Sequence, residues 1–118
     1  MEYSIDLNPR PFDSIKKGIK KIEGRVPTEH NKNFPLNKLK KGDIIAFTNN
    51  ENGEIMKVNV LGVRHYKNVR LMLETEGTRN VLSSQGTVEE GIESYNRLKG
   101  YKEGVKKHGI YAIEVKKL

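Results

Sequence analysis

The chain has 118 residues, which suits one domain and leaves no room for a second independent core. It contains no cysteine, which excludes disulfide bonds, thiolate metal sites and a cysteine nucleophile. Its 22 lysine and arginine residues against 15 acidic ones give a formal net charge of +7, which favours a polyanionic partner such as nucleic acid.

The sequence carries no signal for a membrane. No apolar run approaches the roughly 20 residues that cross a bilayer. The amino-terminal residues 1–6 include acids and lack the apolar core of a signal peptide. We therefore expect a cytoplasmic protein with no membrane partner.

The first predicted elements are a strand and a short helix. Residues 3–7 alternate apolar and polar with period two, the pattern of a half-buried strand. Pro9 and Pro11 should end this strand. Residues 12–17 then predict a short helix, with Gly18 at its left-handed cap.

Further strands follow in the middle of the chain. A second strand is predicted over residues 21–26, and the polar stretch 27–37 is expected to be a surface loop. A turn at residues 41–43 leads into the apolar strand 44–47. These strands are joined by loops, with no long helix between them.

A hairpin should come next. Asn52-Gly53 is a strong turn signal, and the residues from 56 to 60 alternate as its return strand. Gly62 suggests a bulge before a further strand at residues 63–66.

The second half mixes helices with a closing strand. Asn68 should cap a helix that Gly77 ends, and residues 87–90 form a capping box opening another helix whose buried face includes Tyr95. Residues 110–115 predict the last strand. This order favours an α+β fold, an antiparallel sheet or barrel with peripheral helices.

The densest group of charges lies in residues 16–25, which hold four lysines, one arginine and one acid. On an extended strand Glu23 and Arg25 point to the same face, so the carboxylate can orient the guanidinium. The remaining N–H groups of the guanidinium can then donate to a phosphate or a base edge. Gly24 between them would let a ligand or neighbouring backbone approach. If the strand extended back to Lys20, its side chain would point to the face opposite to Glu23 and Arg25, unless the turn before it rotates the chain. The alternative interpretation is a solvated basic turn.

The pattern Gly18-x-Lys20-x-x-Glu23-Gly24-Arg25 resembles the G-x-K-x-x-E-x-R signature of the ASCH domain family, relatives of the PUA domains of RNA modification. Similar blocks continue in order as far as residues 109–114. The resemblance implies a single domain over residues 1–118, a PUA-like antiparallel β-barrel of five or six strands flanked by helices. It also implies a cleft between barrel and helices that binds RNA or a nucleotide, with Lys20, Glu23 and Arg25 as its floor.

The same family suggests an enzymatic alternative. Some ASCH relatives look like amidohydrolases of acetylated cytidine that use a lysine, a threonine three residues on and a later glutamate. Here Lys20 matches the lysine and Glu76 the glutamate, but Glu23 stands at the threonine position. A small hydrolase, either an acetylcytidine amidohydrolase or a ribonuclease, is therefore the alternative to binding without catalysis. A protein-interaction module of translation or transcription is a third hypothesis.

The remaining candidates concern binding. Lys21 belongs to the basic group, and Tyr66 at a strand end is the preferred aromatic for stacking on a base. Further basic runs at residues 38–41 and 99–107 would contribute only if they lie on the same side as the signature.

No metal or cofactor is expected. His30, His65 and His108 lack metal-ligand spacing. The expected partner is RNA or a nucleotide, and no pattern in the chain bears on oligomeric state.

Overall fold

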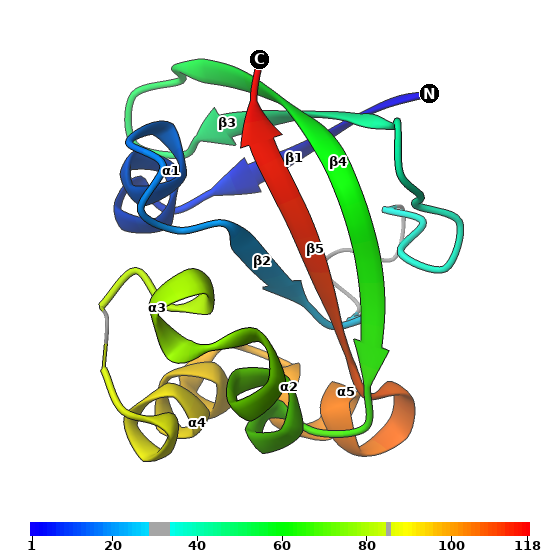
Figure 1. Ribbon diagram of the computed structural model, residues 1–118, viewed down its shortest axis with the longest axis vertical. Coiled ribbons are helices and arrows are strands. Elements are labelled where there is room, and N and C mark those ends of the chain that lie inside the picture. Colours follow the sequence, from blue (N-terminus) through cyan, green and yellow to red (C-terminus); the bar gives the residue numbers. More distant parts are fainter. Residues whose placement is uncertain (29–33, 85) are drawn as a thin grey trace.

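Figure 1 shows a computed structural model that describes residues 1–28, 34–84 and 86–118. Within them, five strands form one curled sheet, a half-barrel, in the order β1-β3-β4-β5-β2. The strands are β1 (Glu2–Leu7), β2 (Ile22–Arg25), β3 (Ile44–Asn49), β4 (Ile55–Tyr66) and β5 (Ile110–Lys117). The helices are α1 (Pro9–Lys16), α2 (Val69–Glu76), α3 (Thr78–Val81), α4 (Val88–Arg97) and α5 (Tyr101–His108). The α+β class and the PUA-like curled sheet are thus confirmed.

The sheet is antiparallel except at one edge. β3 pairs with β4, β4 with β5 and β5 with β2, all antiparallel. β1, however, runs parallel to β3, with Glu2 opposite Ile44, so the fully antiparallel arrangement expected from the sequence is wrong at this pair. The physical reason is the long connection through α1 and β2, which is long enough to return the chain to the end of the sheet where it began.

β4 is one long strand where the sequence suggested two. Its register against β5 shifts between Val60 and Gly62, so the predicted bulge is confirmed, but pairing resumes and continues to Tyr66. A bulge increases local bending and twist, which lets one strand serve both halves of a curled sheet.

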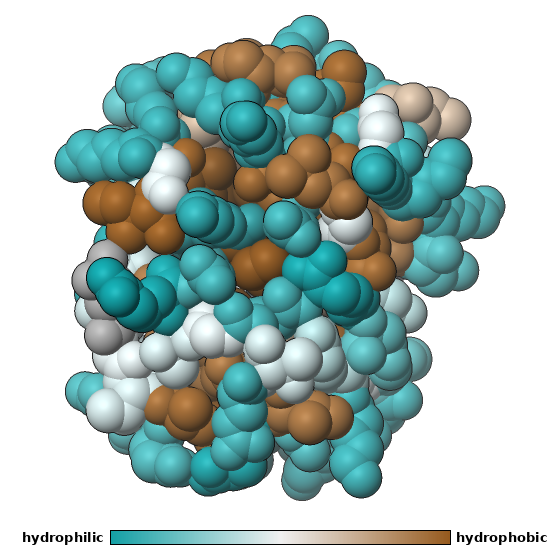
Figure 2. Space-filling model, in the orientation of Figure 1, coloured by the Kyte–Doolittle hydropathy of each residue, from teal (hydrophilic) through white to brown (hydrophobic). Residues whose placement is uncertain are grey.

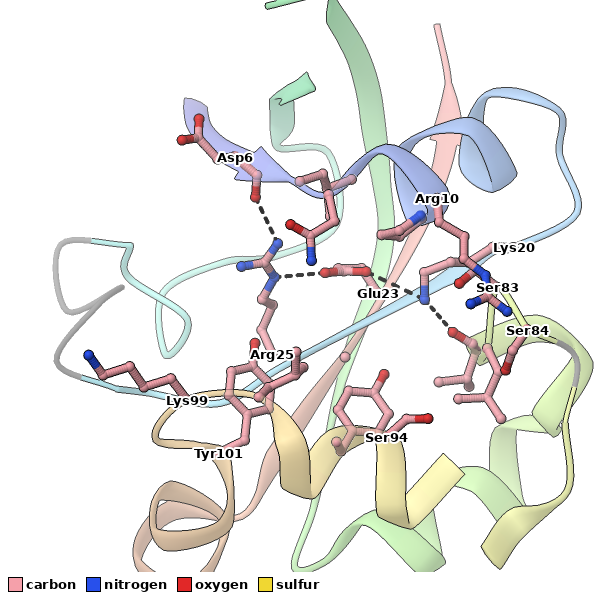
Figure 3. A pocket seen from close by; sticks show the side chains of 18 of the residues that line it. Asp6, Arg10, Lys20, Glu23, Arg25, Ser83, Ser84, Ser94, Lys99 and Tyr101 are labelled. Carbon is pink, nitrogen blue, oxygen red and sulfur yellow. Dashed lines mark hydrogen bonds and ion pairs between the residues drawn. The ribbon is translucent and has the colours of Figure 1, made fainter. Parts of the chain in front are cut away.

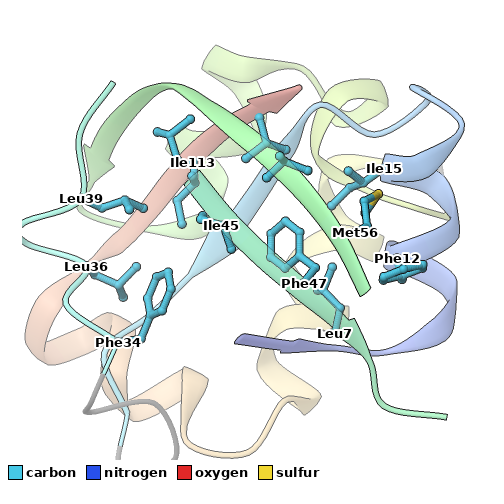
Figure 4. Close-up of a cluster of buried hydrophobic side chains, with 13 residues drawn as sticks. Leu7, Phe12, Ile15, Phe34, Leu36, Leu39, Ile45, Phe47, Met56 and Ile113 are labelled. Atoms are coloured by element: carbon cyan, nitrogen blue, oxygen red, sulfur yellow. The ribbon is translucent and has the colours of Figure 1, made fainter. Parts of the chain in front are cut away.

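Both faces of the sheet are covered, and this produces two cores. Along β5, Ile113 and Val115 face the interior of the half-barrel, whereas Ile110 and Ala112 face the helices. Figure 4 shows the first core, which includes Leu7, Phe12, Ile15, Phe34, Leu36, Leu39, Ile45, Phe47 and Met56. The second core lies between the sheet and the helices drawn below it in Figure 1, and includes Ile22, Val26, Met72, Leu73, Val81, Tyr95 and Tyr101.

Local signals in the sequence place the end of α1, both ends of α2 and the start of α4, whereas α3 and α5 were not predicted. The Asn68 side chain accepts a hydrogen bond from the Leu71 N–H at 2.8 Å, and the capping box at Thr87 and Glu90 is present. Gly18 has a positive φ of 78°, as expected of a cap that follows α1. α1 itself begins at Pro9 rather than residue 12, because proline suits the first turn of a helix, where its missing N–H costs nothing.

The predicted surface loop over residues 27–37 needs a correction. Residues 29–33 lie outside the described part of the chain, but Phe34 and Leu36 are buried at 9% and 4% exposure. Phe34 packs its ring against Tyr3 at 5.8 Å between centroids. The polar residues around them in the sequence therefore hid two residues that belong to the core inside the half-barrel.

None of the helices within the described residues is long and apolar enough to cross a membrane.

Candidate functional site

A cavity of about 480 Å³ lies where the half-barrel is open, between its edge strands β1 and β2 and the helical layer. Figure 3 shows side chains from both sides converging on it. Its wall includes residues from the end of β1, the start of α1, β2, the segment after α3, and α4 with the turn into α5. Charged or polar lining residues are Asp6, Asn8, Arg10, Lys20, Glu23, Arg25, Thr28, Ser83, Ser84, Ser94, Lys99 and Tyr101.

Glu23 is the centre of the charged group in this cavity. The residue is 7% exposed, and its carboxylate lies between two cations. Oε2 accepts from the Arg25 Nε–H at 2.8 Å, and Oε1 lies 3.4 Å from the Lys20 Nζ. The contact expected between Glu23 and Arg25 is present, because side chains two residues apart on a strand share one face.

Lys20 is held from three directions. It is 4% exposed, and its Nζ donates to the carbonyl oxygens of Ile22, at 2.6 Å, and of Val81. Glu23 makes the third contact as an ion pair, so the ammonium lies among two carbonyl oxygens and a carboxylate. Burial lowers the pKa of Lys20, and the negative charge of Glu23 opposes that shift.

Lys20 faces the cavity, although strand alternation would place it on the face opposite to Glu23 and Arg25. β2 begins only at Ile22, so strand alternation does not govern the residue two positions earlier. The chain turns after Gly18, where the Lys20 N–H donates to the Ser14 carbonyl, and this turn rotates the lysine toward the same cavity.

Arg25 spans the open seam of the half-barrel. Its Nη2 donates to the backbone carbonyl of Asp6 at 3.1 Å, from the edge strand β2 to the edge strand β1 (Figure 3). Glu23 therefore fixes one side of the guanidinium while β1 fixes the other. An arginine held in this way is pre-organised for a planar acceptor.

The helical side of the cavity is aromatic. A Cβ at Gly24 would overlap the Tyr95 hydroxyl, so the close approach expected at this glycine is made by the Tyr95 ring, not by a ligand or a backbone. Tyr95 is buried and stacks on Tyr101 with 6.1 Å between ring centroids. Burial raises the pKa of Tyr95 well above its usual value, so its hydroxyl stays neutral.

Glu76 and Tyr66 form a separate cluster. The Tyr66 hydroxyl donates to Glu76 Oε2 at 2.5 Å, and Arg64 donates to both Glu76 oxygens at 2.6 and 2.8 Å. Arg64 lowers the pKa of Glu76, although partial burial opposes this. Neither Glu76 nor Tyr66 is among the described residues lining the cavity, and Lys21 lines a different groove.

The fold thus brings together Lys20, Glu23 and Arg25 from the predicted set. It adds Arg10, the serines that follow α3, Ser94 and Lys99, which the sequence did not single out as binding residues. In the sequence Lys99 stood out only as the start of a basic run. The convergence of these residues depends on helices and strands that are distant in the sequence.

The described residues contain no group of three or more histidine, cysteine, aspartate or glutamate side chains that could hold a metal ion.

A curled five-stranded sheet whose open seam meets a helical layer, with a charged cavity at that seam, is consistent with the PUA-like fold. The ASCH domain family model matches residues 5–118, so the chain belongs to the ASCH domain family, which is associated with RNA binding.

Two solved structures are similar over the whole chain. The crystal structure of hypothetical protein PH0355 has 38% sequence identity and a TM-score of 0.82, with 100% of both chains covered. The solution NMR structure of protein PF0455 from Pyrococcus furiosus has 40% identity and a TM-score of 0.74, covering 100% of this chain and 98% of that one. A comparison with curated proteins finds no significant match.

Proposed function

We propose that the cavity between β1, β2 and α4 binds RNA or a nucleotide, without catalysis, and that residues 1–118 act as one domain. The observation that carries this proposal is the Arg25 guanidinium, which Glu23 and the Asp6 carbonyl hold at the cavity wall. A volume of about 480 Å³ also falls within the roughly 300–1,000 Å³ of small-molecule sites.

The charges of the cavity suit an anionic ligand. Four cationic residues line it, Arg10, Lys20, Arg25 and Lys99, against the two acids Asp6 and Glu23. Arg10 and Lys99 are exposed and come from opposite walls. We assign these two to phosphate contacts, because exposed cations attract the sugar-phosphate backbone whatever the base.

The base would be bound deeper, at Arg25 and Glu23. The guanidinium can donate to a carbonyl or ring nitrogen of a base, and the carboxylate can accept from an exocyclic amino group or a ribose hydroxyl. Lys20 is buried and already contacts Ile22, Val81 and Glu23, so its proposed role is to position Glu23.

Replacing Arg25 by alanine should weaken binding of ribonucleoside monophosphates by about 1–3 kcal/mol, the loss expected for a bidentate contact to a base. Arg25→Lys should lose most of the same affinity, because it keeps the charge but not the planar fork. Isothermal titration calorimetry measures both variants. Arg70→Ala is the matched control, since Arg70 lies on α2 outside the cavity and pairs with Glu89.

A thermal melt of each variant checks the seam contact to Asp6 independently of the ligand. Unchanged affinity in a folded Arg25→Ala protein would remove Arg25 from the site.

The hydrolase alternative predicts turnover of acetylated cytidine by Lys20 and Glu76. We expect none, because the polar contacts of Lys20 are with Ile22, Val81 and Glu23, whereas those of Glu76 are with Arg64 and Tyr66. A carboxylate whose pKa is lowered by an arginine is also a poor proton acceptor at neutral pH. Chromatography of free cytidine after incubation measures the reaction. Release that disappears in Glu76→Gln would establish the enzyme and contradict the binding proposal.

A further inference from the structure

A second groove, of about 500 Å³, lies on the other side of the chain segment that carries Lys20. It is formed by the C-terminal end of α1, the residues before β2, and the C-terminal part of β5, which Figure 1 shows in the same half of the molecule. Five exposed lysines line it: Lys16, Lys17, Lys21, Lys116 and Lys117.

Some of the charges in this groove are already neutralised. Lys16 pairs with Glu54 at 2.5 Å and Lys17 with Asp13 at 3.1 Å. Glu114, the acid in the groove, accepts from Arg64 at 3.0 Å.

The other three lysines differ from Lys16 and Lys17 in this respect. Among the residues that the structure describes, no salt bridge joins Lys21, Lys116 or Lys117 to an acid. The groove is therefore lined by three lysines without an acidic partner among the described residues, and its one acid, Glu114, is already paired with Arg64.

The floor of the groove is apolar. Ile15, Leu61 and Val115 line it; Ile15 and Val115 are buried, so Leu61, at 40% exposure, supplies most of its exposed apolar side-chain surface. Figure 2 shows apolar and hydrophilic residues interleaved on the face seen in Figure 1. Apolar surface with cations at its rim suits a nucleotide chain, whose sugars and bases have apolar faces and whose phosphates are anionic.

Lys20 lines both the groove and the cavity, so the two sites are neighbours across a single short segment. We propose that the groove is the continuation of the cavity, and that Lys21, Lys116 and Lys117 hold the phosphates of nucleotides next to the one in the cavity. The ligand is then a single-stranded RNA, because a free nucleotide has no neighbouring phosphates for the groove to hold. In a duplex the base would stay stacked and could not enter the cavity. This inference rests on the proposed function of the cavity.

The test compares cytidine 5′-monophosphate with a fluorescent twelve-residue single-stranded RNA. The groove variant is Lys21→Gln with Lys116→Gln and Lys117→Gln, and its matched control is Lys102→Gln with Lys106→Gln and Lys107→Gln, three exposed lysines of α5 outside both sites. Affinities are measured by calorimetry and fluorescence anisotropy at several salt concentrations.

We expect the wild-type protein to bind the RNA more tightly than the monophosphate. The groove variant should lose at least about tenfold in RNA affinity, and the slope of log K against log salt should fall by about 2, at roughly 0.7 per lost phosphate contact. Its monophosphate affinity should not change. The control variant should retain RNA binding.

If both triple variants lost RNA affinity equally, only the net charge would matter, and the groove proposal would be overturned. The groove proposal would also be overturned if the wild-type protein bound RNA no more tightly than the monophosphate and the groove variant had unchanged affinities. The cavity proposal would then remain intact. If Arg25→Ala has no effect on either ligand while the groove variant loses RNA, the cavity proposal fails and the groove stands as a separate site. A wild-type protein that binds neither ligand would overturn both.

Discussion

Replacing Lys20 by alanine is expected to lower the free energy of unfolding by about 3–5 kcal/mol, the cost of breaking a buried ion pair by removing one partner. The loss has three sources in this protein. The carbonyls of Ile22 and Val81 lose their donor, and Glu23 loses one of the two cations that compensate its buried charge. Arg25 still holds Glu23, so the lower end of the range is expected. Urea denaturation measures the change.

Two further variants show whether the stability comes from the Lys20 ammonium. One keeps the volume of the side chain, and the other removes a neighbouring positive charge instead. Lys20→Met keeps the aliphatic volume but not the donors, and should lose nearly as much stability as alanine. Lys21→Ala removes the neighbouring exposed lysine and should change stability by no more than about 0.5 kcal/mol. A methionine variant as stable as the wild-type protein would contradict the structural role given to the Lys20 ammonium.

Phe34→Ala should cost about 3 kcal/mol of unfolding free energy, the low end of the range for a buried phenylalanine. The sequence predicts almost no effect, because Phe34 lies in a polar stretch that resembles a surface loop. In the structure Phe34 is 9% exposed, packs on Tyr3 and belongs to the core of the half-barrel. The alanine variant would leave a cavity in this core, beside Tyr3.

Phe34→Leu tests the packing more gently and should cost less than about 1.5 kcal/mol. Leu71→Ala provides an exposed control, since Leu71 is 41% exposed on α2 and should matter little. If Phe34→Ala were as stable as the exposed control, residues 34–36 would not belong to the core.

Helix ends were predictable from the sequence because they depend on local chemistry. Asn68 and Thr87 cap helices through hydrogen bonds that span three residues, and Gly18 adopts a conformation that other residues avoid. The contact between Glu23 and Arg25 was predictable for the same reason, since strand alternation places them on one face.

Features that depend on the path of the chain were not predictable in this way. The parallel pairing of β1 with β3 arises from a connection of more than thirty residues, whose route no local signal determines. Glu76 matches a family glutamate in the sequence, yet Arg64 and Tyr66 hold its carboxylate apart from the cavity.

The sequence by itself determined the family signature, the alternation of the strands, the helix caps and the excess of positive charge, because each is encoded within a few neighbouring residues or in composition. Only the tertiary structure decided which charges meet. It buried Lys20 against the Val81 carbonyl, 61 residues away, and placed Arg25 across the seam to Asp6. The physical reason is that a cavity at the seam of a curled sheet is built from edges that are distant in the chain, and their approach depends on packing of both cores rather than on local preference.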